Sequence, residues 1–119
     1  MTIVVSSSTQ CPDLTPLRLS VERLDHDHLV IRVAGDVDAV GTPRLRELLE
    51  AKLRGVTRAV VLDLSAVTFL SSAGLSELDR AHLLAAELGV RFTVHVGEAR
   101  QVRRVIELFP LAVFSAVDG

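Results

Sequence analysis

Residues 59–78 read AVVLDLSAVTFLSSAGLSEL, and this stretch decides the fold. Its first part contains a continuous apolar run, which is typical of a β-strand covered on both faces. The run stops at Leu70 and two serines follow. Apolar residues then recur at helical spacing from Leu75 onward, and Gly89 closes that pattern. The stretch therefore predicts a strand that turns at SSAG (71–74) into an amphipathic helix.

Hydrophobic periodicity extends this unit in both directions along the chain. Two alternating segments joined by a polar turn predict a β-hairpin before it, and a strand and a helix follow it. In the helix before the central strand, Thr42 is expected as N-cap and Pro43 at the first helical position. The predicted strands cover 17–24, 29–35, 57–64 and 90–96; the predicted helices cover 42–54, 75–88 and 98–109. Residues 111–117 fit either a last strand or a fourth short helical segment.

This order of elements predicts an α/β fold. Right-handed crossovers between parallel strands place helices against a sheet, so we expect one mixed sheet of four to five strands, with helices packed mainly on one face. Residues 17–119 form a single domain in this prediction. Residues 1–16 are expected to be a flexible tail, in which only Ile3, Val4 and Val5 fit an edge strand.

Composition excludes several classes of function. The 119 residues carry a formal net charge of −2 and contain four Phe but no Trp or Tyr, which argues against nucleic-acid binding. A single cysteine, Cys11, rules out an intramolecular disulfide. No apolar run is long enough to span a bilayer and no secretory signal is visible, so we expect a soluble cytoplasmic protein without membrane insertion.

Motifs for metal binding or catalysis are weak. His26 and His28 stand among aspartates, but a solvated hairpin turn explains this cluster without a metal. SSAG lacks the glycine that precedes the serine in a nucleophile elbow, and His82 lies too far along the helix to reach either serine. No phosphate-cradling glycine loop occurs. We therefore expect no enzyme activity, no metal and no cofactor.

The two serines of SSAG have two physical interpretations. A serine just before a helix caps it by accepting a hydrogen bond from a backbone N–H. A helix N-terminus also tolerates negative charge, so a phosphate on a serine there would not unfold the helix. Ala73 and Gly74 would leave such a hydroxyl accessible to an incoming active site. On these grounds alone the corner is either a cap or a modification site.

The chain resembles the STAS domain, the fold of bacterial anti-sigma factor antagonists, from about Leu17 to Val117. The resemblance is carried by VIRVAGDVDAVGTPRLRELL (30–49) and by AVVLDLSAVTFLSSAGLSEL (59–78). Gly35, Asp36 and Asp38 match the family's Gly-acidic-x-Asp turn. Where the family usually has Asp-Ser-Ser/Thr-Gly, this chain has Ser71, Ser72, Ala73 and Gly74.

The resemblance implies that Ser72 is the phosphate acceptor, with Ser71 in place of the usual acid. It further implies a partner-binding face made of Asp36, Asp38 and residues 71–74. The partner would be an anti-sigma factor with serine kinase activity, and a metal-dependent phosphatase would remove the phosphate. A STAS module without the switch, acting as a scaffold, a lipid-transport subunit or a small-ligand sensor, is the alternative. Self-association stays open.

Overall fold

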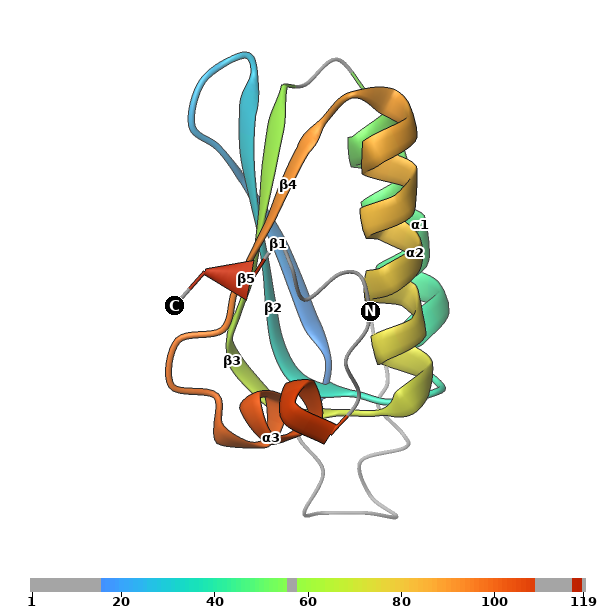
Figure 1. Cartoon of the computed structure of the whole chain (residues 1–119), viewed down its shortest axis with the longest axis vertical. Coiled ribbons are helices and arrows are strands. Elements are labelled where there is room, and N and C mark those ends of the chain that lie inside the picture. Colours follow the sequence, from blue (N-terminus) through green and yellow to red (C-terminus); the bar gives the residue numbers. More distant parts are fainter. Residues whose placement is uncertain (1–15, 56–57, 109–116, 119) are drawn as a thin grey trace.

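The computed structural model describes residues 16–55, 58–108 and 117–118. These residues form a five-stranded sheet and three helices (Figure 1). The elements are β1 (Arg18–Arg23), β2 (His28–Val37), α1 (Thr42–Arg54), β3 (Ala59–Leu70), α2 (Ser72–Leu88), β4 (Arg91–His95), α3 (Arg100–Leu108) and β5 (Val117–Asp118). The strand order in space is β1-β2-β3-β4-β5; β1 is antiparallel to β2 and the other neighbours are parallel. The predicted α/β class and mixed sheet are confirmed.

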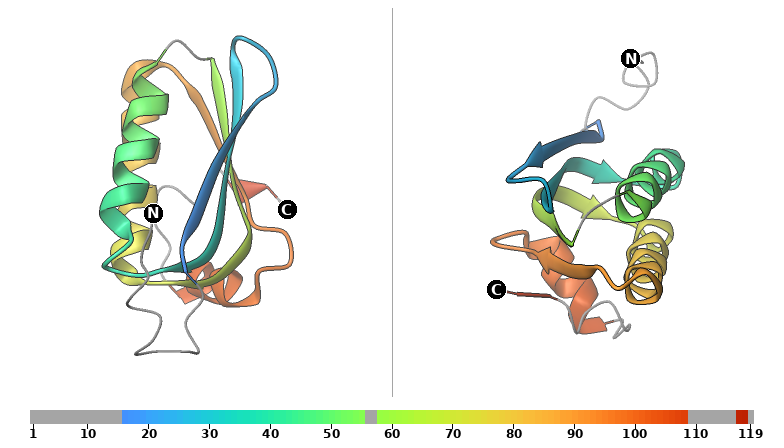
Figure 2. Two further views of the ribbon diagram at one scale, coloured as in Figure 1. Left: turned by 180° about the vertical axis from the view of Figure 1, so that it is seen from behind. Right: turned by 90° about the horizontal axis from the view of Figure 1, so that it is seen from above.

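Two of the helices form a second layer. Helices α1 and α2 lie side by side against one face of the sheet, whereas α3 sits at the end of the sheet where β3 finishes (Figure 2). No helix among the described residues covers the opposite face. The prediction that helices pack mainly on one face is therefore confirmed. Helix α3 is the exception, because it lies at the end of the sheet.

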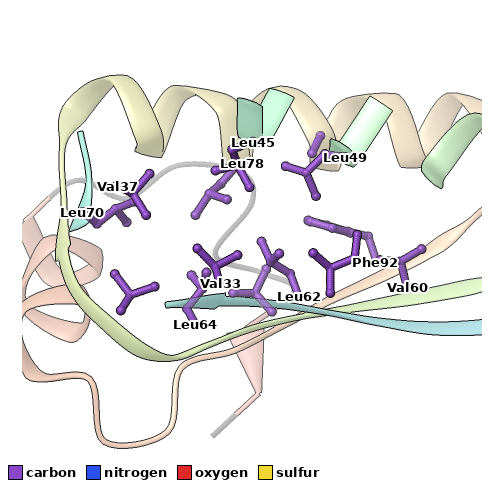
Figure 3. Close-up of a cluster of buried hydrophobic side chains, with 14 of the residues drawn as sticks. Val33, Val37, Leu45, Leu49, Val60, Leu62, Leu64, Leu70, Leu78 and Phe92 are labelled. Carbon is purple, nitrogen blue, oxygen red and sulfur yellow. The ribbon is translucent and has the colours of Figure 1, made fainter. Parts of the chain in front are cut away.

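The core lies between the sheet and the two covering helices. Alternate side chains of β2, β3 and β4 point towards the helices, as the two-residue period of a strand requires. They meet leucines that recur every three or four residues along α1 and α2 (Figure 3). The largest fully buried side chains are Ile31, Leu45, Leu53, Leu62, Leu64 and Leu78. The core is aliphatic, as a chain with four Phe and no Trp or Tyr requires.

One ion pair joins the two covering helices. The Arg46 Nε and Nη2 atoms of α1 donate to Glu77 Oε2 of α2 at 3.0 Å and 2.5 Å. The Glu77 side chain is 7% exposed and the Arg46 side chain 47% exposed. This hydrogen bond and the carboxylate charge raise the pKa of Arg46 above its ordinary value. A carboxylate this buried needs such a partner, since an unpaired one would be costly.

Two strands run further than the hydrophobic pattern predicts. Strand β2 does not stop at Gly35 but extends to Val37, and β3 continues through 65–70 to Leu70. The reason is mutual pairing, because Asp36 lies opposite Phe69 and Val37 opposite Leu70. Register shifts within this segment disturb the simple alternation on which the sequence prediction relied.

Among the described residues, no strand pairs with the far end of β3 on its β4 side, and α3 contacts this end instead. Strand β4 pairs with β3 only as far as Asp63. At Leu70, the Gln101 side chain satisfies the backbone groups of β3. Its Oε1 accepts from the Leu70 N–H at 2.7 Å and its Nε2 donates to the Leu70 carbonyl at 3.3 Å. One amide thus serves the backbone as a neighbouring strand would.

The start of α1 differs from the prediction. The N-cap is Gly41 and not Thr42, and no side chain caps this helix. The Thr42 hydroxyl instead donates to the Asp38 carbonyl at 2.6 Å, and the Thr42 N–H donates to the same carbonyl at 3.0 Å. This local turn makes Thr42 the first residue of the helix. Pro43 is therefore the second helical residue and not the first as predicted, but it still lies in the first turn, where its missing N–H breaks no intrahelical hydrogen bond.

Some predictions fall outside the described residues. The tail over 1–16, with its apolar Ile3–Val5, lies there except for Pro16. Of residues 111–117, only Val117 is described, and it begins β5. The division of the chain into tail and domain therefore stays a prediction.

We expect Gln101→Met to lower the free energy of unfolding by about 1–3 kcal/mol, because it strips a buried backbone N–H and carbonyl of their partner. Leu70 is 2% exposed, so water does not readily replace the amide. Urea denaturation followed by circular dichroism measures the change. Arg104→Met, at an exposed position of the same helix, is the control and should shift stability by less than about 0.5 kcal/mol. Equal effects of the two changes would contradict the assigned role of Gln101.

Candidate functional site

Ser71 forms the corner between β3 and α2. Its backbone is extended and its N–H donates to the Val37 carbonyl at 2.9 Å. Its hydroxyl accepts from the Gly74 N–H at 3.1 Å, which makes Ser71 the N-cap of α2. Its carbonyl accepts from the Leu75 N–H at 2.9 Å. Of the two interpretations of the corner, the helix cap is therefore observed, and Ser71 provides it.

Ser72 is the first residue of α2 and is exposed. Within the described part of the chain its side chain has no hydrogen-bond partner. The first turn of α2 contains no acidic residue, so the positive end of the helix dipole is not neutralised there. The Ser72 side chain is therefore exposed at the positive end of α2.

Gly74 lets the helix approach the sheet. A Cβ atom at this position would lie 2.6 Å from Val37 Cγ1 and 2.9 Å from Leu70 Cδ1, which is closer than real Cβ contacts. The first turn of α2 thus rests directly on the ends of β2 and β3. Ala73, half-buried, is the other small residue of the corner. The absence of side chains at Gly74 sets the position at which α2 begins.

The two aspartates of the predicted turn have different surroundings. Asp36 was expected in a loop, but it lies within β2, where its carboxylate accepts from the Thr68 hydroxyl at 2.5 Å. Asp38 lies just after β2 and shapes the next turn, because its Oδ1 accepts from the Gly41 N–H at 2.9 Å. Val37 stands between the two acids and contacts the corner through its carbonyl. The structure therefore brings both aspartates close to residues 71–74.

Two exposed apolar side chains at this end escaped the sequence analysis. Val40, in the loop before α1, is 87% exposed, and Phe69, next to the end of β3, is 43% exposed. Val40 could have been noticed in the sequence, because it is an apolar residue within the polar segment DVDAVG (36–41). Phe69 belongs to an apolar run in the sequence, so no sequence pattern indicated that its side chain is exposed. Its exposure became evident only from its place in the sheet. We call Asp36, Asp38, Val40, Phe69 and residues 71–74 the corner surface.

The other motifs of the sequence do not join this surface. His28 Nδ1 lies 2.8 Å from Asp25 Oδ1, and this contact closes the hairpin turn and lowers the pKa of Asp25. Groups of three or more potential metal ligands do not occur among the residues that the structure describes. His82 lies ten residues after Ser72 on the same helix, about 15 Å along its axis. No described histidine is positioned to activate either serine.

Comparison with known proteins identifies the family. The family model of the STAS domain matches residues 19–116. This chain belongs to the STAS domain family. Across 16–55, 58–108 and 117–118, none of this STAS domain's helices combines the length and apolarity that crossing a membrane requires.

Several proteins similar to this chain are named as anti-sigma factor antagonists. Over 61 residues the STAS chain is 36% identical to the anti-sigma-B factor antagonists of Listeria monocytogenes and Listeria innocua. The match spans 50% of this chain and 52% of each relative, about half their length. The structure of an anti-sigma factor antagonist from Mycobacterium paratuberculosis is 31% identical, with a TM-score of 0.65 over 81% of this chain and 85% of that one.

A more distant structure confirms the fold alone. The anti-sigma factor antagonist SpoIIAA in its unphosphorylated form has a TM-score of 0.70 at 16% identity, over 85% of this chain and 86% of that one. The predicted STAS fold, which rested on the order of the elements and on the corner motif, is therefore confirmed.

We expect Gly74→Ala to destabilise this domain by about 1–3 kcal/mol, because the added methyl overlaps the stiff Val37 side chain in a well-packed core. Thermal and urea denaturation measure the change. Gly55→Ala is the matched control, since a Cβ there meets only carbonyl oxygens at 3.5 Å and the backbone φ is −75°. The Gly55 variant should be neutral to slightly stabilising. A neutral Gly74→Ala would show that α2 can move away from the sheet at little cost.

The two serines should differ in their effect on stability. Ser71→Ala removes the cap of α2 and is expected to cost about 1 kcal/mol, whereas Ser72→Ala should change stability by less than about 0.5 kcal/mol. Ser71→Asp keeps a capping oxygen and should preserve stability. Parallel urea titrations of the three variants and the unchanged chain provide the comparison. An equal loss at both serines would contradict the division of roles.

Proposed function

We propose that this STAS domain is an anti-sigma factor antagonist that binds its partner through the corner surface and is switched by phosphorylation of Ser72. One observation carries the proposal. Ser71 caps α2 through its hydroxyl, while the neighbouring Ser72 side chain is exposed at the helix N-terminus and forms no hydrogen bond with another described residue. The mycobacterial and Listeria relatives, named as antagonists, supply the class of partner.

The proposed partner is an anti-sigma factor with serine kinase activity. When the antagonist occupies it, the sigma factor is released. The kinase transfers the γ-phosphoryl group of ATP to Ser72 Oγ; the new O–P bond forms as the bond to ADP breaks, and the hydroxyl proton passes to a base of the kinase. A metal-dependent phosphatase restores the serine. In this cycle the STAS domain is substrate and binding partner, and the catalysis belongs to the other proteins.

Electrostatics explains how one phosphate would act. It adds about −1.5 to −2 charges at pH 7. Helix α2 itself favours the phosphate, because its first turn has no acid and the N-terminal end of its dipole is positive. If a partner packs on Val40, Phe69 and the small residues of the corner, the phosphate must either lose its hydration in the interface or keep the two surfaces apart. Both outcomes weaken binding. The switch therefore weakens binding without unfolding the domain.

The neutral residue at position 71 favours a second candidate function. Without an acid beside Ser72, the domain fits a STAS module that is not phosphorylated and serves as a scaffold, a lipid-transport subunit or a ligand sensor. Co-purification distinguishes the two, because an antagonist retains a small kinase-like ATPase and a transport module retains a transporter ATPase. Retention of a transporter and of no kinase would favour the second function.

Phosphorylation by the co-purified kinase tests the switch directly. We expect intact-mass spectrometry to find one phosphate on the unchanged chain after incubation with kinase and ATP, and none on Ser72→Ala. Ser71→Asp restores the family's acid and shows whether the neutral neighbour slows the reaction. An active kinase that binds the domain but leaves Ser72 unmodified would overturn the switch.

A charge at Ser72 should weaken binding specifically. We expect Ser72→Glu to raise the Kd for the partner about tenfold or more, because an interfacial charge is left unpaired. Ser76→Glu is the matched control, since Ser76 is exposed one turn further along the same helix. Isothermal titration calorimetry compares the two variants. Equal affinities would place the partner elsewhere on the domain.

A further inference from the structure

The free edge of the sheet is strand β1, and its hydrogen-bonding groups are open in a defined pattern. The order β1-β2-β3-β4-β5 leaves one side of β1 without a described strand. The Leu24 N–H donates to the His28 carbonyl at 2.9 Å, and the pairing continues without a shift to Arg18 opposite Ala34. In an antiparallel ladder the direction alternates by residue, so even positions of β1 bond to β2. The backbone groups of Leu19, Val21 and Arg23 therefore point outward.

The side chains of β1 also alternate between two faces. Leu19 and Val21 share the helix-covered face with their buried partners Val33 and Ile31. Val21 is nevertheless 38% exposed, because it stands at the margin of the sheet. Arg18, Ser20 and Glu22 point to the open face of the sheet.

We propose that β1 pairs antiparallel with β1 of a second copy, about a two-fold axis at Ser20. In this register Arg18 lies opposite Glu22 of the second copy, and Glu22 lies opposite its Arg18. Leu19 and Val21 face one another in the same way on the helix side. The two sheets then become one continuous sheet.

Charge complementarity singles out this register. A two-fold axis at Arg18 would place Arg18 opposite itself, and an axis at Glu22 would place two carboxylates opposite one another, both of which are unfavourable. Only the axis at Ser20 pairs the opposite charges. Arg18 has no ion-pair partner among the described residues, whereas Glu22 contacts Arg32 at 2.5 Å and keeps its second oxygen for Arg18.

Backbone geometry agrees with the same axis. Because Leu19 and Val21 present outward N–H and carbonyl groups, the pairs Leu19–Val21 and Val21–Leu19 each exchange two hydrogen bonds across the interface. Ser20 then forms a non-hydrogen-bonded pair with its copy, with Cα atoms about 4.5 Å apart. The proposal uses the β1 edge and is independent of the corner surface and of Ser72.

Cysteine trapping tests the axis in the full chain. In a Cys11→Ser background, Ser20→Cys is expected to form a disulfide-linked dimer under mild oxidation, because the Cα distance suits a disulfide. Glu22→Cys is the matched control on the same strand and face. Its copy lies four residues away, about 13 Å, which no disulfide spans. Equal cross-linking at both positions, or none at position 20, would overturn the proposal.

Charge exchange provides an independent readout. Sedimentation velocity of the unchanged chain at about 10–200 μM should show a monomer–dimer equilibrium, since a strand interface is small. Arg18→Glu alone and Glu22→Arg alone should each raise the dimer Kd about tenfold or more. Mixing the two variants restores both opposite-charge pairs and should recover the dimer. A monomer throughout, or a dimer indifferent to both changes, refutes pairing through β1.

Discussion

The close approach of α2 to the ends of β2 and β3 is the contact on which the rest of the structure depends. It requires Gly74, because a Cβ there would overlap Val37 and Leu70. The Ser71 N–H reinforces the contact by donating to the Val37 carbonyl. Once the helix starts at this point, Leu75 and Leu78 reach the core. The helix can then cover the sheet beside α1.

The same contact separates the roles of two adjacent serines. The N-terminus of α2 lies against the sheet, and a small side chain must satisfy its free N–H groups there. The Ser71 hydroxyl does so by accepting a hydrogen bond from the Gly74 N–H. Ser72 follows on the outer side of the first turn, where nothing among the described residues holds its hydroxyl. Ser71 thus caps the helix, and the Ser72 hydroxyl takes no part in the cap. The proposed switch is consistent with this division, since a charge on Ser72 enters no core contact.

The open edge of the sheet follows a different constraint. Strand β1 must keep Leu19 and Val21 on the helix side to complete the core, yet no described strand protects its outer backbone. Natural edge strands often carry charges that discourage pairing. Here the charges have opposite sign at positions 18 and 22, so a register that places Arg18 opposite Glu22 is the one that charge favours. The partner proposed for this edge is therefore a second copy of the chain.

Local patterns in the chain were sufficient for the element order, the mixed sheet and the helix C-termini at Gly55 and Gly89, because these follow from periodicity and backbone freedom. Long-range pairing decided the rest. Asp36 became a strand residue through its position opposite Phe69. Gln101 acquired its role only when α3 met the end of β3. The contacts of Asp36 with Phe69 and of Gln101 with Leu70 join residues about thirty positions apart, and no local pattern records them.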